Sequence, residues 1–332
     1  MLYIHIILIV LCLVLNKNKT IPLFVLLWLL FINVNDVTRP DYAVYEQWYN
    51  EAIIVPDKGW FLLSQLFSGF GLSYKTFSTF VYALGYIVLY NIAKKITANI
   101  NVVIALYLIF PCFYDLIQIR FFVVSVLIFV GIFCLSKMRV VEYLCLVITA
   151  ATFHKIALCY TIFCVLALKQ KKIILANLMI FAFFALFFEG ELKQYLFADI
   201  FNSKYITYNY SLISSLVYSS IPIIGFGFIV FFQKKCGSTN QFVDLVKNIL
   251  LVCSAFFPLI LILLDFYRLY RGILFETYIA SVLLYQEINL FKNKFMYIFS
   301  GFILLLLLTF IFYGISGDFV AINDSLLRLQ IM

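Results

Sequence analysis

Apolar runs separated by short lysine clusters constrain this chain more than any other feature of its sequence. A membrane-spanning helix needs about 20 apolar residues, with roughly 17 to 25 tolerated, and many of the runs approach that length before a cluster such as "NKNK" at 16–19 interrupts them. Of the 332 residues, 65% are hydrophobic and 12% are charged. A soluble domain could not bury this much apolar surface. The pattern therefore predicts an all-α, polytopic integral membrane protein.

The charged residues between the runs predict about twelve membrane-spanning helices in a single transmembrane domain, residues 1–332. The first run is expected to remain as a helix, because no small-residue cleavage site follows it. The predicted spans are 2–15, 20–34, 76–93, 99–116, 120–136, 139–152, 155–168, 173–188, 211–232, 246–264, 271–288 and 295–315.

Lysine and arginine are distributed differently across this topology. If residues 16–19 face the cytoplasm, strict alternation puts 13 of the 18 lysines on that side, as the positive-inside rule requires. Five of the six arginines fall outside: Arg39, Arg120, Arg268, Arg271 and Arg328. The net charge of +8 thus reflects topology, and no basic patch indicates nucleic acid.

The arginines on the outer face permit two interpretations. A single arginine at a helix end often extends its charged head toward the membrane surface while its stem lies among apolar groups. Four arginines at helix ends on one face, where the positive-inside rule disfavours them, favour a function. The guanidinium group is a planar fork that binds phosphate or carboxylate through two hydrogen bonds and keeps its charge in any environment.

Two outer loops, about 35–75 and 189–210, contain much of the remaining polar sequence. In the first loop an aspartate and three tyrosines recur at spacings close to one helical face, which predicts an amphipathic or re-entrant segment: Asp41, Tyr42, Tyr45 and Tyr49. The second loop is rich in tyrosine, and Tyr218 follows it. Its tyrosines are compatible either with a carbohydrate groove or with ordinary aromatic residues of the membrane interface.

Three further polar segments interrupt the apolar runs on the same face. The first, 110–122, contains Asp115, Gln118 and Arg120; the second, 149–160, contains His154; the third, 263–278, contains Arg268 and Arg271, three residues apart. A lone histidine is usually a buried core residue, but His154 shares its face with the arginines, so both interpretations stay open. The turn around His154 is expected to enter the bilayer, where irregular backbone must line a protein cavity.

Cysteine and histidine usage argues against a metal or disulfide centre. The eight cysteines form no C-x-x-C pair and mostly lie within apolar runs, which is typical of small buried hydrophobic residues. Two histidines are too few for a histidine-built metal site. No D-x-D nucleotide-sugar motif is present, and we expect neither a metal nor a cofactor.

The polar motifs, in order, resemble those of the EpsG-like branch of the Wzy-type polysaccharide polymerases. The matching segments are "RPDYAVY" (39–45), "DKGWFLLSQLF" (57–67), "IQIRFFVV" (117–124), "TFHKIAL" (152–158) and "YRLYRGILFETY" (267–278). The similarity covers about residues 35 to 280. The chain departs from the family pattern at Asp57, where a glutamate is usual, at Phe121, where a glutamine often follows the arginine, and at Lys155, where a serine is common.

The resemblance implies a GT-C-like architecture and a glycosyltransferase that polymerises undecaprenyl-diphosphate-linked repeat units of O-antigen, capsule or exopolysaccharide. It implies work at the outer face of the bacterial inner membrane, with lipid-linked glycans and membrane lipid as partners, and it is compatible with a chain-length regulator. The implied diphosphate- and substrate-binding residues are Arg39, Tyr42, Asp57, Gln118, Arg120, Arg268 and Arg271, with Arg271 the better match to the family's late arginine.

Glycosyl transfer also needs a group that takes the proton of the acceptor hydroxyl. His154 and Asp41 are the candidates for this catalytic role. His154 has a pKa near neutral pH by residue type, but it could equally bind phosphate as a cation. Asp41 could instead orient Arg39 or bind a sugar hydroxyl.

Three other functions compete with polymerisation. An O-antigen ligase would share the architecture and the outer arginines. A flippase or transporter of the same lipid-linked sugar would need polar residues deep in the helices, on a path open to both sides. An acyltransferase of surface sugars would normally present a histidine on a route from the cytoplasm, whereas His154 is predicted outside.

Overall fold

The computed structural model describes residues 2–35, 39, 41–167, 180, 212–257, 266–288 and 291–309, and within these residues every regular element is a helix. The all-α prediction is therefore confirmed for this part of the chain. The predicted span at 173–188, apart from Ile180, the predicted loop at 189–210 and Arg328 lie outside the described residues.

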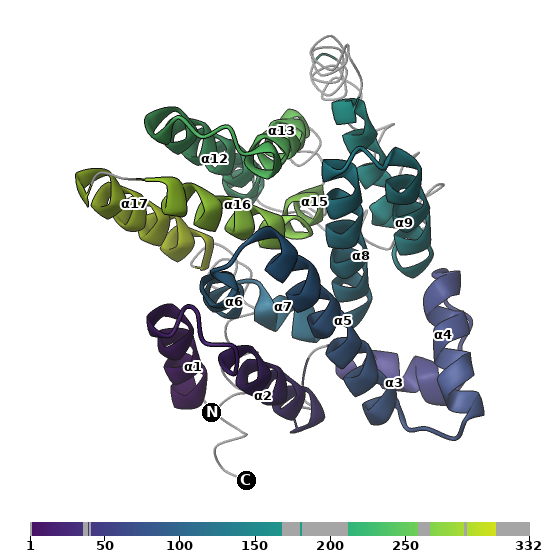
Figure 1. Ribbon diagram of the computed structural model, residues 1–332. Coiled ribbons are helices and arrows are strands. Elements are labelled where there is room, and N and C mark those ends of the chain that lie inside the picture. The colour runs from purple at the N-terminus through teal and green to yellow at the C-terminus, as the bar shows by residue number, and fades with distance from the viewer. Residues whose placement is uncertain are drawn as a thin grey trace.

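Figure 1 shows the described helices in space. Their bounds are α1 Leu2–Val14, α2 Ile21–Asn35, α3 Tyr42–Asn50, α4 Lys58–Gly69, α5 Tyr74–Ile96, α6 Ile100–Ile109, α7 Cys112–Ile117, α8 Ile119–Ser136, α9 Val140–Phe153, the 3₁₀-helix η1 Lys155–Ala167, α12 Leu212–Cys236, α13 Gln241–Ala255, α15 Tyr267–Arg271, α16 Leu274–Glu287 and α17 Phe291–Thr309.

Among the described residues, three helices are long and apolar enough to cross a membrane: Tyr74–Ile96, Ile119–Ser136 and Leu216–Cys236. Shorter apolar helices accompany them, at Tyr3–Val14, Ile21–Asn35, Ile100–Ile109, Val140–Phe153, Lys155–Ala167 and Lys294–Leu306. These helices support a membrane protein, while the full set of twelve spans stays a prediction.

One predicted span is interrupted in the structure, and another begins after a break. The span at 99–116 is divided into α6 and α7 at Pro111, because proline lacks the N–H that a helix needs and forces the preceding Phe110 into an extended conformation. The span predicted at 271–288 is formed by α16, which begins at Leu274, and Gly272 and Ile273 separate it from the short helix α15 that precedes it. Both interruptions leave a very short helix, α7 or α15, beside a longer one.

The segment at 155–167 forms a 3₁₀-helix instead of the α-helix that a span of this length suggests. Such long 3₁₀ runs are uncommon. A 3₁₀-helix rises about 2.0 Å per residue, against about 1.5 Å in an α-helix. The short segment therefore extends further across the bundle, and it packs antiparallel against α9 and beside α13.

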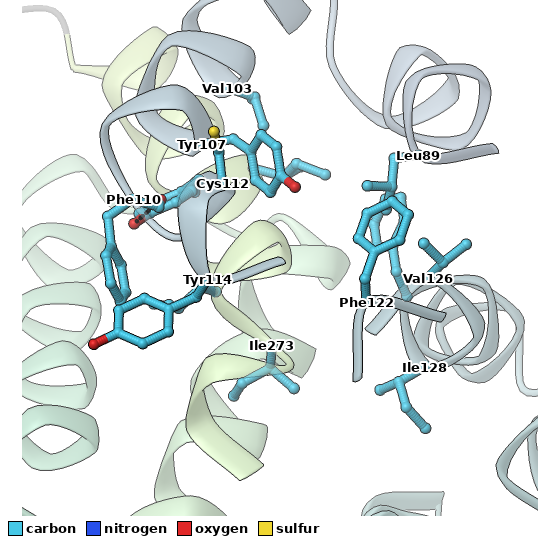
Figure 2. Close-up of a cluster of buried hydrophobic side chains, with 14 of the residues drawn as sticks. Leu89, Val103, Tyr107, Phe110, Cys112, Tyr114, Phe122, Val126, Ile128 and Ile273 are labelled. Carbon is cyan, nitrogen blue, oxygen red and sulfur yellow. Dashed lines mark hydrogen bonds between the residues drawn. The ribbon is translucent and has the colours of Figure 1, made fainter. Parts of the chain in front are cut away.

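Buried aromatic and aliphatic side chains join the helices into one core. Figure 2 shows part of this core, where Leu89 of α5, Tyr107 of α6, Tyr114 of α7 and Phe122 of α8 are drawn with their neighbours. Many large apolar side chains on α1, α2 and α17 are exposed instead. Exposed apolar surface of this extent is what a lipid environment requires.

The charged residues separate into two ends of the helix bundle. The lysine end carries Lys17, Lys19, Lys94 and Lys95, at the α1–α2 and α5–α6 connections. The arginine end carries Arg39 after α2, Arg120 at the start of α8, and Arg268 and Arg271 in α15. Lys58, Lys75 and Lys155 also lie at this end, so the predicted separation of lysine from arginine is a partial bias among the described residues.

Asn101 of α6 holds the lysine end together. Its side chain is buried, and its amide nitrogen donates hydrogen bonds to the carbonyl oxygens of Leu15, at 2.7 Å, and Asn18, at 2.8 Å. Both carbonyl groups belong to the turn that follows α1, and that of Leu15 also accepts from the backbone N–H of Asn18. The α1–α2 connection is thereby fixed against the start of α6.

Replacing Asn101 by leucine, which has a similar size, should destabilise the protein by about 1–3 kcal/mol, because the carbonyl groups of Leu15 and Asn18 each lose a side-chain hydrogen bond. We expect a lower thermal unfolding midpoint for the purified protein in detergent. The control Asn91→Leu changes an exposed asparagine of α5 and should leave the midpoint unchanged. Equal midpoints for the two variants would contradict this role of Asn101.

Candidate functional site

The polar segments that the sequence assigns to one face meet at the arginine end of the bundle. Arg271 hydrogen-bonds to Gln118, and Arg268 contacts His154. Arg120 pairs with Asp57, and Arg39 bonds to the backbone at the end of α7. The arginine side chains therefore connect segments that are up to 153 positions apart in the sequence.

Arg120 is held between α3, α4 and the start of α8. Its guanidinium forms an ion pair with Asp57, and its Nε lies 3.4 Å from the hydroxyl of Tyr45. The guanidinium carbon is 5.1 Å from the centre of the Tyr45 ring and 5.0 Å from that of Trp48. Arginine favours such aromatic faces. The predicted outer segment at 35–75 thus folds into two helices that enclose Arg120.

The prediction of a single helical face in the first outer loop is confirmed. α3 has three buried residues, Tyr42, Tyr45 and Tyr49, and these are the tyrosines whose spacing predicts that face. Asp41 precedes the helix at its N-cap position. The buried tyrosines pack α3 against the aromatic residues of α4 and α5.

Asp57 has the environment of a buried carboxylate with one strong partner. Burial raises the pKa of Asp57 above its ordinary value, and the charges of Arg120 and Lys155 oppose that rise. The short side chain of this aspartate reaches the guanidinium of Arg120.

Arg271 is the most deeply enclosed of the site arginines, with 2% of its surface exposed. Its Nη2 donates a hydrogen bond of 2.7 Å to Oε1 of Gln118. Its guanidinium carbon lies 4.3 Å from the centre of the Phe121 ring and 5.4 Å from that of Tyr114. Phe121, which departs from the family pattern, therefore contacts the late arginine directly.

The guanidinium of Arg271 retains unused donors. Its Nε and Nη1 are buried, and neither has a hydrogen-bond acceptor within the part of the chain that the structure describes. A buried donor without an acceptor costs about 1–3 kcal/mol, and more when the group is charged. An anionic ligand with two oxygen atoms would supply these acceptors, since the guanidinium fork matches phosphate and carboxylate geometry.

His154 lies in the turn between α9 and η1, outside both helices. Its Nε2 is 3.5 Å from Nη1 of Arg268. Burial lowers the pKa of His154 well below its ordinary value, and the charges of Arg268, Arg120 and Arg271 lower it further. Because arginine can only donate, a hydrogen bond between the two requires an unprotonated Nε2. Burial and the neighbouring guanidinium groups both favour the neutral imidazole.

Arg39 directs its fork to the protein backbone. Nη1 donates to the carbonyl oxygen of Leu116 at 2.7 Å, and Nη2 donates to that of Asn33 at 3.1 Å. The hydroxyl of Tyr82 also bonds to the carbonyl of Leu116, at 2.7 Å. Arg39 thereby joins the end of α2 to the end of α7. Arg39 therefore has a structural role in the site, in addition to any contact with a ligand.

Tyr160 positions the short helix that carries Arg268 and Arg271. Its hydroxyl donates to the carbonyl oxygens of Arg268, at 3.1 Å, and Leu269, at 3.2 Å. The hydroxyl approaches so closely that a Cβ atom at Gly272 would overlap it. Glycine at 272 is therefore required for this contact.

Sequence patterns did not identify several of these residues. Tyr82, Tyr107 and Tyr160 lie within apolar runs and look like ordinary core residues, yet their hydroxyls bond to backbone or side-chain groups of the site. Tyr107 donates to Oδ2 of Asp115 at 2.9 Å. The sequence offered one signal of these hydrogen bonds: each position within an apolar run is a tyrosine, whose hydroxyl needs a partner when buried, and not a phenylalanine.

Glu276 is a second residue that sequence patterns did not identify. It has 1% of its surface exposed, and neither carboxyl oxygen has a hydrogen-bond partner among the described residues. It belongs to the segment "YRGILFETY", so the motif contained it. The described residues contain no cluster of three or more His, Cys, Asp or Glu side chains that could hold a metal ion.

Gly59 allows α4 to begin directly against α9. A Cβ atom at this position would overlap the side chain of Thr152 and lie 3.1 Å from its backbone carbonyl carbon. Gly59→Ala should therefore separate the helices and displace Asp57, with a destabilisation of about 1–3 kcal/mol, typical of overpacking. Thermal unfolding in detergent measures this effect.

The matched control for Gly59 is Gly69, in the same helix, where an added Cβ meets no atom within 4 Å. Gly69→Ala should leave the unfolding midpoint close to that of the unchanged protein. If Gly59→Ala unfolded at the same temperature as Gly69→Ala, the close contact between α4 and α9 would not be essential.

Comparison with known proteins identifies the family of this chain. The family model for EpsG matches residues 19–327, a range that includes every polar segment of the site. No curated protein and no solved structure is significantly similar to the chain. The match extends over nearly the whole sequence, and the earlier resemblance is confirmed: the chain belongs to the EpsG family.

Proposed function

We propose that this membrane protein polymerises lipid-linked oligosaccharide repeat units by glycosyl transfer. Membership of the EpsG family supports a polysaccharide polymerase-related membrane protein. The observation that carries the proposal is the buried guanidinium of Arg271, with two unused donors, among further cations at one end of the bundle.

The proposed donor is a glycan chain on undecaprenyl diphosphate, and the acceptor is a single repeat unit on the same lipid. Transfer breaks the bond between the anomeric carbon and the diphosphate, so negative charge develops on the leaving group. Fixed cations stabilise such charge best where water is excluded. Arg271 would bind the leaving diphosphate through Nε and Nη1, which lack an acceptor within the described part of the chain.

The other arginines would have separate roles. Arg268 and Arg120 would extend the positive surface around the diphosphate, with Arg120 anchored by Asp57. Arg39 and Tyr42 would position the end of α7, and Gln118 would orient Arg271. Lysine could not replace these residues fully, since its ammonium group lacks the planar fork.

His154 is the better candidate for the general base. Burial and the neighbouring arginines keep its pKa low, which favours the neutral imidazole that a base requires. As the acceptor hydroxyl attacks the anomeric carbon, His154 would take its proton and become charged. Asp41, at the N-cap of α3, stays a second candidate that could orient a sugar hydroxyl.

The proposal includes a location and partners. The lysine end would face the cytoplasm, by the positive-inside rule, and the arginine end would face the outside of the bacterial inner membrane. The product would be O-antigen, capsule or exopolysaccharide, and a chain-length regulator is a candidate partner. Neither a metal nor a cofactor is part of this mechanism.

In a deletion strain of the native host, Arg271→Lys should fail to restore long polysaccharide chains. Removing a single donor from a charge-stabilising site typically lowers the rate about 10²–10³-fold. We expect gels of surface polysaccharide to change from a ladder to a single repeat unit. Arg120→Lys should give the same result, because lysine cannot maintain both the ion pair with Asp57 and the aromatic contacts.

The matched control is Arg139→Lys. Arg139 is exposed at the start of α9, at the other end of the bundle, where it pairs with Glu142. Full ladders from the Arg271 and Arg120 variants, with membrane levels like the control, would contradict the proposed diphosphate site. Loss of all surface glycan in the deletion strain, with lipid-linked units retained inside, would instead favour a flippase.

The pH dependence of polymerisation distinguishes the two roles of His154. A base is active when neutral, so a lowered pKa predicts a rate that stays constant as pH falls through 6.5 and declines only below it. A phosphate-binding imidazolium predicts the opposite, a rate that falls as pH rises toward 7. Membrane vesicles supplied with lipid-linked repeat units, assayed between about pH 5 and pH 8, separate these outcomes.

A further inference from the structure

A groove between α2 and α5 is distinct from the site at the arginine end. It has a volume of about 190 Å³ and is lined mainly by apolar side chains of α2, α5 and α6, including Leu26, Leu89 and Ile104. Phe275 of α16 contributes to its wall. Exposed Leu23 and Ile87 at its margin show that it opens toward the lipid-facing surface. The groove has the dimensions and character to hold part of a hydrocarbon chain.

The groove has a positively charged mouth at the lysine end. Lys19 lines it directly. Tyr90 also lines it, and the ammonium group of Lys94 lies 5.8 Å from the centre of the Tyr90 ring. Asn101 fixes the connection that carries Lys17 and Lys19 against the start of α6. Two ammonium groups and a phenol hydroxyl therefore border one end of an apolar channel.

Among the described residues of the helices that border the groove, little negative charge lies near this mouth. Residues 1–35 and 74–110, which include α1, α2, α5 and α6, contain four lysines at the lysine end and not one aspartate or glutamate. α16 brings Glu287 toward the same end, where its neighbour Gln286 bonds to Thr97. Four positive charges against one leave an excess of +3. This excess of positive charge would favour an anionic ligand at the mouth of the groove.

We propose that this groove binds one anionic diacyl phospholipid, with its phosphate at Lys19 and Lys94 and one acyl chain along α2 and α5. Each lysine near an anionic lipid surface contributes measurably to binding, and the apolar walls account for the chain. The charge lies at the end opposite the arginines, which favours a phospholipid of the lysine-side leaflet. The proposal does not depend on the polymerase function.

Native mass spectrometry of the purified full-length protein tests the charge. Phosphatidylglycerol and phosphatidylcholine with identical acyl chains are added separately. The first phosphatidylglycerol should bind about 10-fold more tightly than phosphatidylcholine. The double variant Lys19→Gln/Lys94→Gln should weaken phosphatidylglycerol about 10- to 30-fold and leave phosphatidylcholine unchanged. The control Lys234→Gln/Lys235→Gln alters lysines at the end of α12 and should match the unchanged protein.

A second pair of variants tests the chain-binding wall. Leu26 lines the groove, whereas its neighbour Leu27 is exposed and does not. Leu26→Trp should weaken both lipids at the first site, and Leu27→Trp should weaken neither. The proposal would be overturned if the unchanged protein bound phosphatidylglycerol and phosphatidylcholine equally. It would also be overturned if the α12 control lost as much affinity for phosphatidylglycerol as the Lys19→Gln/Lys94→Gln variant. Stoichiometric displacement of phosphatidylglycerol by a polyprenyl diphosphate would also overturn it, because the groove would then belong to the lipid-linked substrate.

Discussion

The arginine end of the bundle depends on one constraint: a guanidinium removed from water must find its hydrogen-bond acceptors and counter-charges in the protein. The site arginines meet this constraint to different degrees. Arg39 bonds to two backbone carbonyls, and Arg120 has a carboxylate and two aromatic rings. Arg271 has a single amide acceptor and two aromatic rings. An arginine whose donors all bond to protein groups, such as Arg39, supports the structure. An arginine with unused donors, such as Arg271, is the better candidate for binding a ligand.

Interrupted helices provide the backbone that this arrangement requires. Pro111 and Gly272 end helices within the bundle, and the short helices α7 and α15 that result carry or border the polar residues. Carbonyl groups of these short helices receive hydrogen bonds from Arg39, Tyr82 and Tyr160. Irregular backbone among apolar residues is tolerated only when protein groups satisfy it. The tyrosine hydroxyls thus hold the site in place without adding charge.

The two ends of the molecule show how differently lysine and arginine are used. Lysines remain at the exposed connections, where a hydrated ammonium group determines topology and, as we propose, binds lipid phosphate. Arginines are enclosed, since a planar, weakly hydrated fork is less costly to bury. Arg139 differs from the site arginines. It is exposed at the lysine end and forms a surface ion pair with Glu142.

Much of this architecture could be predicted from the sequence, because apolar runs and their lysine boundaries follow directly from the thickness of a bilayer. The face of α3 could also be predicted, since the spacing of its tyrosines is a helical period. The breaks in the helices at Pro111 and Gly272 could not be predicted as readily. Proline at 111 gives a signal, but the interruption at Gly272 depends on Tyr160, which is 112 positions earlier in the chain.

The sequence could not predict the individual partners of the arginines either, because most of these partners lie far away in the chain. The four outer arginines that the structure describes could be assigned to one face from topology alone. Only tertiary packing decides that Arg39 meets backbone carbonyls while two donors of Arg271 meet none among the described residues.

Binding of farnesyl diphosphate and farnesyl monophosphate to the purified protein tests the central claim most directly. The two probes share a tail and differ by one phosphate group. The account predicts a clear preference for the diphosphate, lost in Arg271→Lys and retained in Arg139→Lys. Equal affinity for the two probes, or a preference that survives in Arg271→Lys, would contradict it.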